Sequence, residues 1–192
     1  PPTVGAVEWP GGPVPIGFVF QEPTLMPWAD ISSNVQLPLK LAGNVDPMAV
    51  AQTLDRVGLK NFAQSYPREL SGGMKMRASI ARALVTEPQL ILMDEPFAAL
   101  DEITRFKLNN DLLALWRDLG RTVIFVTHSV FESVYLSQRI VVMTPRPGRV
   151  FTQIAIDAPY PRDELFRTSP EYGAFCRRVA EALGKAMAGG VA

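Results

Sequence analysis

The chain has 192 residues, of which 47% are hydrophobic, and this size and composition suit one globular domain with a sizeable core. Nineteen basic residues balance nineteen acidic ones, so the formal net charge is zero. Since no overall field would steer such a protein to nucleic acid or to an anionic membrane surface, the charge balance argues against both as direct partners.

Cysteine content and the lengths of the apolar runs indicate a soluble protein of the cytoplasm. Cys176 is the only cysteine, which excludes an internal disulfide. No signal-type segment and no run of eighteen apolar residues occurs, and the apolar residues 123–126 suit a buried strand. Any membrane association would therefore come from docking to another subunit. Because the first residue is Pro1 rather than methionine, we expect a fragment or a processed chain.

The first half of the chain predicts a short strand followed by a mostly helical region. Residues 1–15 are rich in proline and glycine, which indicates turns and short edge strands. A strand is expected over 17–20. Helices are expected over 46–58, where Asp46 can cap the first turn, and over 73–85.

After Pro88 the pattern changes to an alternation of strands and helices. Strands are expected over residues 89–93, 122–126 and 139–143, and helices over residues 102–119, 130–137 and 170–187. Alternation of this kind predicts a parallel sheet with crossover helices. Residues 145–149 and 159–161 are turn-rich.

Two adjacent carboxylates, Asp94 and Glu95, follow the apolar run 90–93. They are expected at the carboxyl end of a buried strand, which is where open parallel sheets bind ligands. A merely charged strand end is the alternative. Paired carboxylates beside a buried strand are costly, however, unless a cation or a substrate uses them.

Ser71, Gly72 and Gly73 immediately precede the helix expected over 73–85. A serine hydroxyl and unhindered backbone N–H groups at a helix start can face an anion, where the helix dipole also favours negative charge. An ordinary serine cap is the alternative. His128, the only histidine, follows the strand expected over 122–126 and could hydrogen-bond a phosphate, although a lone histidine is more often structural.

Four short motifs occur in a fixed order between Leu70 and His128. They are Leu70-Ser71-Gly72-Gly73-Met74, then Leu90-Ile91-Leu92-Met93-Asp94-Glu95-Pro96, then Ala99-Leu100-Asp101, and finally Thr127-His128. The series resembles the ATP-binding cassette of membrane transporters. The resemblance implies a P-loop NTPase-like α/β fold, with a mostly parallel sheet, flanking helices and a helical subdomain.

The resemblance also implies a role for each motif in hydrolysis of Mg²⁺-ATP. Asp94 would help to hold Mg²⁺, and Glu95 would act as the general base toward the attacking water. His128 would contact the γ-phosphate. Gln21, which follows the strand expected over 17–20, resembles the glutamine that senses Mg²⁺ and that water.

The signature motif implies a second subunit. In this family Ser71, Gly72 and Gly73 bind the γ-phosphate of a nucleotide held by the opposite subunit, so a head-to-tail dimer, most simply a homodimer, is part of the mechanism. Asp101 would lie at the dimer interface, and it can also cap the helix expected over 102–119.

Residues 22–28 place several large apolar side chains next to prolines, which is costly unless something covers them. Folding back onto the same domain is one reading. By resemblance, Leu25, Met26 and Trp28 instead line the groove that receives a short helix of the transmembrane permease. The protein would then lie peripherally on the cytoplasmic face of the membrane.

Within the family, the motif Phe20-Gln21-Glu22-Pro23 and the segments 93–101 and 145–149 look like those of importers of nitrate, sulfonate, taurine and related small solutes. A solute-binding protein would then be an indirect partner. We expect four segments: a remnant of an N-terminal β layer (1–20), a Q-loop and helical subdomain with the signature (21–87), an α/β catalytic core (88–150), and a C-terminal tail and helix (151–192).

The family's phosphate-binding loop, Gly-x-x-x-x-Gly-Lys-Ser/Thr, is not found in the 192 residues. Gly12 and Gly17 have the right separation, but Phe18 and Val19 occupy the lysine and hydroxyl positions. We therefore expect an N-terminally truncated chain that is inactive by itself. Two alternatives stay open: a degenerate, non-hydrolytic cassette with a binding or regulatory role, and a soluble cassette ATPase that acts on nucleic acid.

Overall fold

The computed structural model describes residues 4–9 and 11–188, and the chain divides into two compact units. The first unit comprises the chain up to Ala99 together with Leu119–Ile124. The second comprises Leu100–Asp118 and the chain from Phe125 onward. The division into four segments expected from the sequence stays a prediction.

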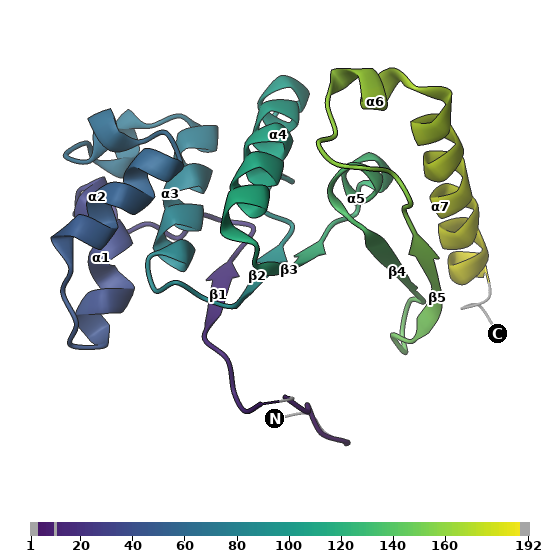
Figure 1. Cartoon of the computed structure of the whole chain (residues 1–192), viewed down its shortest axis with the longest axis horizontal. Coiled ribbons are helices and arrows are strands. Elements are labelled where there is room, and N and C mark those ends of the chain that lie inside the picture. The colour runs from purple at the N-terminus through teal and green to yellow at the C-terminus, as the bar shows by residue number, and fades with distance from the viewer. Residues whose placement is uncertain (1–3, 10, 189–192) are drawn as a thin grey trace. The chain divides into compact units, whose positions relative to one another are not determined.

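The sheet of the first unit has the strand order β1-β2-β3, with β1 at Ile16–Val19, β2 at Leu90–Asp94 and β3 at Thr122–Val126 (Figure 1). β1 pairs with β2 in parallel, and Val19 lies opposite Met93. The mixed α/β fold with a parallel sheet is thus confirmed. Among residues 4–9 and 11–15, by contrast, no edge strand forms, and residues 1–3 and 10 lie outside the described part.

Three α-helices accompany this sheet: α1 (Ile31–Leu41), α2 (Pro47–Arg56) and α3 (Gly72–Leu84). Two single 3₁₀ turns, Lys60–Phe62 and Pro67–Glu69, connect α2 to α3. The helices expected over 46–58 and 73–85 are confirmed, and the Asp46 carboxylate accepts hydrogen bonds from the N–H groups of Met48 and Ala49 at 2.9 and 3.1 Å.

Gly17 permits a close approach between β1 and the end of α3. A Cβ atom built on Gly17 would lie 2.7 Å from the Ala83 carbonyl oxygen and 3.1 Å from Cγ of Pro88. Contacts below 3 Å with backbone require a shift of the neighbouring chain. The absence of a side chain at Gly17 is therefore what sets the spacing between sheet and helix.

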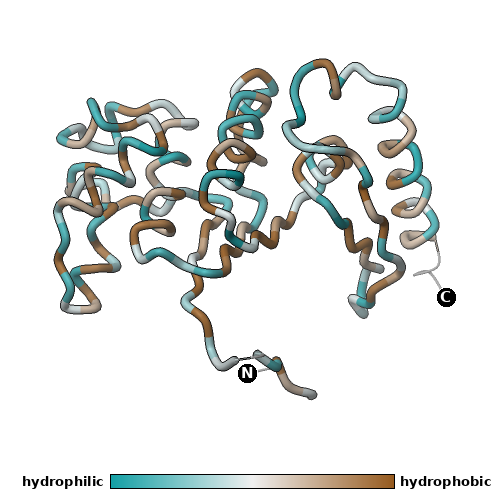
Figure 2. The backbone as a smooth tube through the Cα atoms, viewed as in Figure 1, coloured by the Kyte–Doolittle hydropathy of each residue, from teal (hydrophilic) through white to brown (hydrophobic). Residues whose placement is uncertain are grey.

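The second unit contains α4 (Glu102–Leu119), α5 (Val130–Leu136), β4 (Arg139–Met143), β5 (Val150–Ala155), α6 (Glu164–Thr168) and α7 (Pro170–Ala188). The helices expected over 102–119, 130–137 and 170–187 are confirmed. Figure 2 shows apolar and polar residues alternating along α7. Its apolar side, which includes Tyr172, Cys176 and Val179, joins the core of this unit.

The strand expected over 139–143 forms, but its place in a parallel sheet was wrong. β4 instead pairs antiparallel with β5 in a separate two-stranded sheet, with Val141 opposite Gln153. The connection between them is closed by Thr144, whose N–H donates to the Arg149 carbonyl at 2.8 Å and whose hydroxyl accepts from the Arg149 N–H at 3.0 Å. This local closure favours a hairpin over a crossover.

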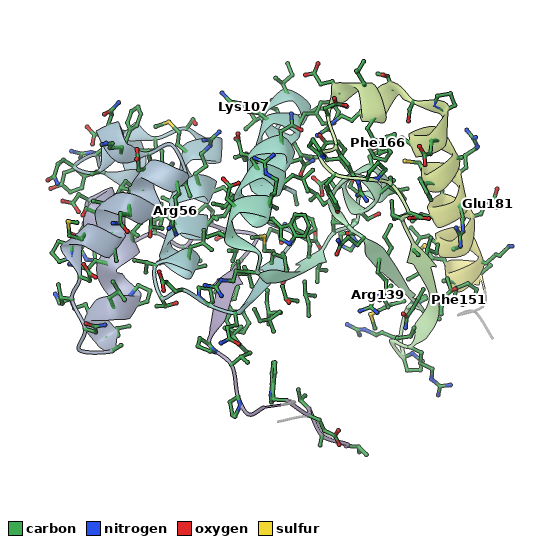
Figure 3. The ribbon with its side chains drawn as sticks, viewed as in Figure 1. Arg56, Lys107, Arg139, Phe151, Phe166 and Glu181 are labelled. Carbon is green, nitrogen blue, oxygen red and sulfur yellow. The ribbon has the colours of Figure 1, made fainter. Side chains whose placement is uncertain are left out.

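A buried arginine, Arg162, ties the end of α5 to the segment that leads into α6. One of its terminal nitrogens donates to the carbonyl oxygens of Val134, Tyr135 and Ser137, each at 2.9 Å. Its guanidinium carbon lies 4.2 Å from the ring centre of Tyr160 and 5.4 Å from that of Phe166, which Figure 3 labels. Burial lowers the pKa of Arg162 from its usual value. The arginine thus neutralises the negative end of α5.

In the part of the chain that the structure describes, no helix combines the length and the apolar character needed to span a membrane.

Candidate functional site

Parallel pairing of β1 with β2 brings Gln21 and the two carboxylates to one edge of the sheet. Asp94 is the last residue of β2, and Gln21 lies two residues beyond Val19, the last residue of β1. Because Val19 and Met93 are opposite each other, the residues that follow them leave the sheet at the same end. Of the three, Gln21 and Asp94 are exposed and Glu95 is partly buried.

The backbone of Glu95 has a conformation that residues other than glycine seldom adopt. Its φ is +44°, in the left-handed region, and its carbonyl oxygen accepts a hydrogen bond from the Ala98 N–H at 3.1 Å. Pro96 and Phe97, which follow, are buried. Strained backbone of this kind persists only where surrounding packing imposes it, and it is common at functional sites. The turn therefore fixes the direction in which the Glu95 side chain leaves the strand.

The donor set at this edge suits a magnesium ion held jointly with a phosphate. Carboxylate and amide oxygens are hard ligands, and Mg²⁺ is usually held by one or two protein carboxylates together with water and substrate phosphates. Within residues 4–9 and 11–188, no cluster of three or more His, Cys, Asp and Glu side chains forms a complete metal cage. Asp94 and Gln21 fit a partial coordination shell of this type.

Ser71 caps α3, as the alternative of an ordinary serine cap predicts. Its hydroxyl oxygen accepts from the Met74 N–H at 3.3 Å, and both Ser71 and Gly72 are exposed, whereas Gly73 is buried. The exposed first turn leaves backbone N–H groups directed away from the helix body. The capping role is observed, and contact with phosphate stays a prediction.

Arg82, near the other end of α3, holds the segment that follows Gln21. Its guanidinium donates to the carbonyl oxygens of Thr24 and Pro23 and to the Thr24 hydroxyl, each at 2.8 Å. Burial lowers the pKa of Arg82 from its usual value. Thr24 itself has a φ of +46°. No local pattern in the sequence indicates this contact, which spans 58 positions.

Asn34 of α1 anchors the apolar segment expected to meet a permease. Its side-chain oxygen accepts from the Met26 N–H at 2.7 Å, and its amide nitrogen donates to the carbonyl oxygens of Met26 and Ala29. Leu25 and Met26 are partly buried, while 77% of the Trp28 surface is exposed. Leu25 and Met26 thus pack partly against their own unit, whereas the Trp28 side chain is exposed to solvent.

Asp101 and His128 belong to the second unit. Asp101 caps α4, because its Oδ1 accepts from the Thr104 N–H at 2.9 Å, and hydrogen bonding by Thr104 lowers the pKa of its carboxyl. His128 is exposed and stands between β3 and Ser129, the residue that caps α5.

Comparison with known proteins gives matches along most of the chain. Residues 8–98 match the family model described as ABC transporter. This part of the chain is therefore similar to the ATP-binding domain of ABC transporters. The match ends just after Glu95 and takes in Gln21, the cap of α3 and both carboxylates of the strand-end edge.

Three relatives illustrate the ABC similarity. An ATP-binding protein of Brucella abortus is 47% identical over 170 residues, which are 87% of this chain and 65% of that protein. An ABC transporter ATP-binding protein of Methanocaldococcus jannaschii is 47% identical over 170 residues (87% of this chain, 62% of the relative). An aliphatic sulfonates import ATP-binding protein of Bacillus licheniformis is 44% identical over 163 residues (85% and 63%). The chain thus spans a little less than two thirds of the relatives that it matches.

Proposed function

We propose that this chain is part of the ATP-hydrolysing subunit of an importer for a small solute, with an aliphatic sulfonate as the first candidate. Nitrate and taurine are the next candidates. The observation that carries the proposal is the positive φ of Glu95 at the end of the sheet where Gln21 and Asp94 also emerge. The relative named for import of aliphatic sulfonates supports the choice of solute.

Each residue of the site has a defined task in this proposal. Bound Mg²⁺-ATP supplies an electrophilic γ-phosphorus. Glu95 accepts the proton of the attacking water, a contribution typically of about 10²- to 10⁴-fold in rate. Asp94 and Gln21 supply oxygen ligands to the ion, and His128 donates a hydrogen bond to the phosphate. Ser71, Gly72 and Gly73 bind the phosphate from the opposite subunit.

The proposal includes two protein contacts. Asp101 lies at a head-to-tail interface with a second ATPase subunit, most simply a second copy of this chain. Trp28, with Leu25 and Met26, meets the permease, so that the subunit sits peripherally on the cytoplasmic face of the membrane and a solute-binding protein acts through the permease. The backbone contacts of Asn34 and Arg82 support this assignment, since they hold the apolar segment in a defined conformation.

Replacing Glu95 tests the catalytic assignment. A chimera that joins the family's phosphate-binding loop ahead of residue 8 should hydrolyse ATP, and Glu95→Gln in that chimera should bind ATP as a dimer with little turnover. Glu87→Gln is the matched control, because Glu87 is exposed and also has a positive φ, +49°. Phosphate release in Glu95→Gln at the rate of the unsubstituted chimera would refute the proposal.

We further propose that the 192 residues alone do not bind ATP appreciably, since they include no phosphate-binding loop. Charge-assisted hydrogen bonds contribute about 1.5 to 3 kcal/mol each, and such a loop supplies several. Calorimetric titration of the folded chain with Mg²⁺-ATP should show no saturable binding. Saturable binding, or a chimera that binds ATP without turnover, would favour the degenerate, non-hydrolytic cassette.

A further inference from the structure

A buried carboxylate in the second unit connects the loop that ends at Asp101 with the residue before His128. Glu132, on the first turn of α5, is only 6% exposed. Its Oε2 accepts a hydrogen bond from the Thr127 hydroxyl at 2.6 Å. Its Oε1 lies 3.5 Å from Nε of Arg105 on α4. The Glu132 side chain therefore contacts both Thr127, the residue before His128, and Arg105 of α4.

Each end of this connection reaches a loop that carries a proposed functional residue. Arg105 donates from Nη2 to the Leu100 carbonyl oxygen at 2.9 Å, directly before Asp101, and its own N–H donates to the Asp101 carbonyl oxygen at 2.9 Å. At the other end, the Thr127 hydroxyl accepts from the Ser129 N–H at 2.9 Å. The hydroxyl thus holds the backbone on the far side of His128.

The network formed by Arg105, Glu132 and Thr127 is centred on a buried carboxylate, and this burial makes its contacts important for stability. A buried carboxylate costs free energy unless it is paired and hydrogen-bonded, so Glu132 restrains the positions of both Arg105 and Thr127. Because the guanidinium is a planar fork, Arg105 can serve the Leu100 carbonyl and Glu132 at the same time. A movement of the 99–101 loop would therefore change the position of Glu132, and with it the backbone on either side of His128.

We propose that Arg105, Glu132 and Thr127 are positioning residues that couple the conformation of the loop ending at Asp101 to that of His128. This inference rests on the proposed function for its biological meaning. If Asp101 meets a second subunit, closure of the dimer sets the position of His128 through this network. Coupling within the unit is nevertheless a property of the chain itself, and it can be measured without nucleotide.

His128 is the only histidine, so a single Hε1–Cε1 cross-peak in the NMR spectrum of the 192-residue chain labelled with ¹³C-histidine reports on its imidazole. Arg105→Lys keeps the charge but loses the fork, and we expect it to shift the His128 signal. Glu132→Gln should shift that signal as well. Arg117→Lys is the control, because Arg117 lies on the same helix in an exposed ion pair with Asp118, and it should leave the signal in place.

A second pair of variants separates the hydroxyl contact from any general loss of folding. Thr127→Val removes the donor to Glu132 at nearly constant volume and should shift the His128 signal, whereas Thr127→Ser should restore it. If Arg105→Lys leaves the signal where Arg117→Lys leaves it, in samples with unchanged circular dichroism, the coupling is refuted. Should Glu132→Gln not fold, the Arg105 and Thr127 comparisons decide.

The failure of the proposed function would be distinguishable. In the hydrolysing chimera, Arg105→Lys should lower kcat by roughly tenfold or more with little change in KM, since misplacement of a catalytic group acts on the transition state. A shifted His128 signal together with a chimera that never hydrolyses ATP would overturn the function and leave the coupling intact. Hydrolysis with normal kcat in Arg105→Lys, together with an unshifted His128 signal, would overturn the coupling and leave the proposed function intact.

Discussion

The two units hold their candidate functional residues in different ways. In the first unit, Glu95 and Ser71 stand at the ends of a strand and a helix, and backbone geometry sets their positions: a φ of +44° for Glu95 and a helix cap for Ser71. In the second unit, buried charged side chains fix the backbone: Glu132 contacts Thr127, the residue before His128, and Arg162 ties the end of α5 to the segment that leads into α6. The features that position Glu95 and Ser71 are local in sequence. The contacts that Glu132 makes with Arg105 and that Arg162 makes with Val134 join positions far apart in the chain.

The comparison predicts that the largest loss of stability follows from removing a buried charged side chain in the second unit. Arg162→Leu leaves the carbonyl groups of Val134, Tyr135 and Ser137 without their donor, and we expect it to lower the free energy of unfolding of that unit by about 3 kcal/mol or more. Native-state hydrogen exchange of the β4, β5 and α7 amides would measure the loss. Arg162→Lys keeps the charge but reaches fewer carbonyls, so its free energy of unfolding should lie between those of Arg162→Leu and the wild type. Equal stability of Leu and wild type would mean that this network does not hold the unit.

In the first unit, the packing of β1 against α3 can be tested by adding a single methyl group at Gly17. Gly17→Ala would place Cβ 2.7 Å from the Ala83 carbonyl oxygen, and the overpacking should cost about 1 to 3 kcal/mol. Gly184→Ala in α7 is the matched control, because a Cβ there meets nothing within 4 Å, and better helix propensity should stabilise by about 0.5 to 1 kcal/mol. Urea denaturation of the two variants should therefore give changes of opposite sign. A Gly17→Ala variant that is as stable as the wild type or more stable would show that β1 and α3 pack less tightly than the structure indicates.

Most of the secondary structure could be predicted from the sequence because its signals are local. Asp46 and Asp101 cap the helices expected to follow them, and α4 and β3 occupy the residues expected. The pairing of β4 was mispredicted because alternation of strands and helices does not report which strand becomes the neighbour. The C-terminal tail was expected to begin at residue 151, yet residues 151–155 form most of β5, which is that neighbour.

The supporting side chains could not be predicted, because their partners lie far away along the chain. Arg82 contacts Thr24 across 58 positions, and Glu132 joins α5 to Arg105 of α4. A single sequence contains no pattern that links such positions. α1 was missed for a local reason: Pro38 interrupts its helical pattern, although the first turn is capped by Asp30.

Ser71 provides a smaller effect that separates stability from function. Ser71→Ala and Asp46→Ala each remove a helix cap, so each should cost about 1 kcal/mol of stability. Only Ser71→Ala should also lower ATP turnover in the hydrolysing chimera, because Asp46 lies outside the candidate site. Parallel measurement of urea denaturation and of phosphate release tests both statements. Equal losses of turnover in the two variants would mean that Ser71 acts only as a helix cap and has no direct role in ATP hydrolysis.

The smallest expected effect concerns the pH dependence of the Asp101 cap. Hydrogen bonding by Thr104 lowers the pKa of the Asp101 carboxyl below its usual value, so the folded state favours the ionised form. The stabilisation is then fully present above the pKa of an unfolded aspartate and is lost as pH falls through the lower, folded-state value. Asp101→Asn can still cap α4 but does not titrate, so its stability should change less over this acidic range than that of the wild type. NMR titration of the carboxyl carbon gives the folded-state pKa directly. A value at or above that of a model peptide would mean that Asp101 does not hold its cap in solution and is free to turn toward another partner.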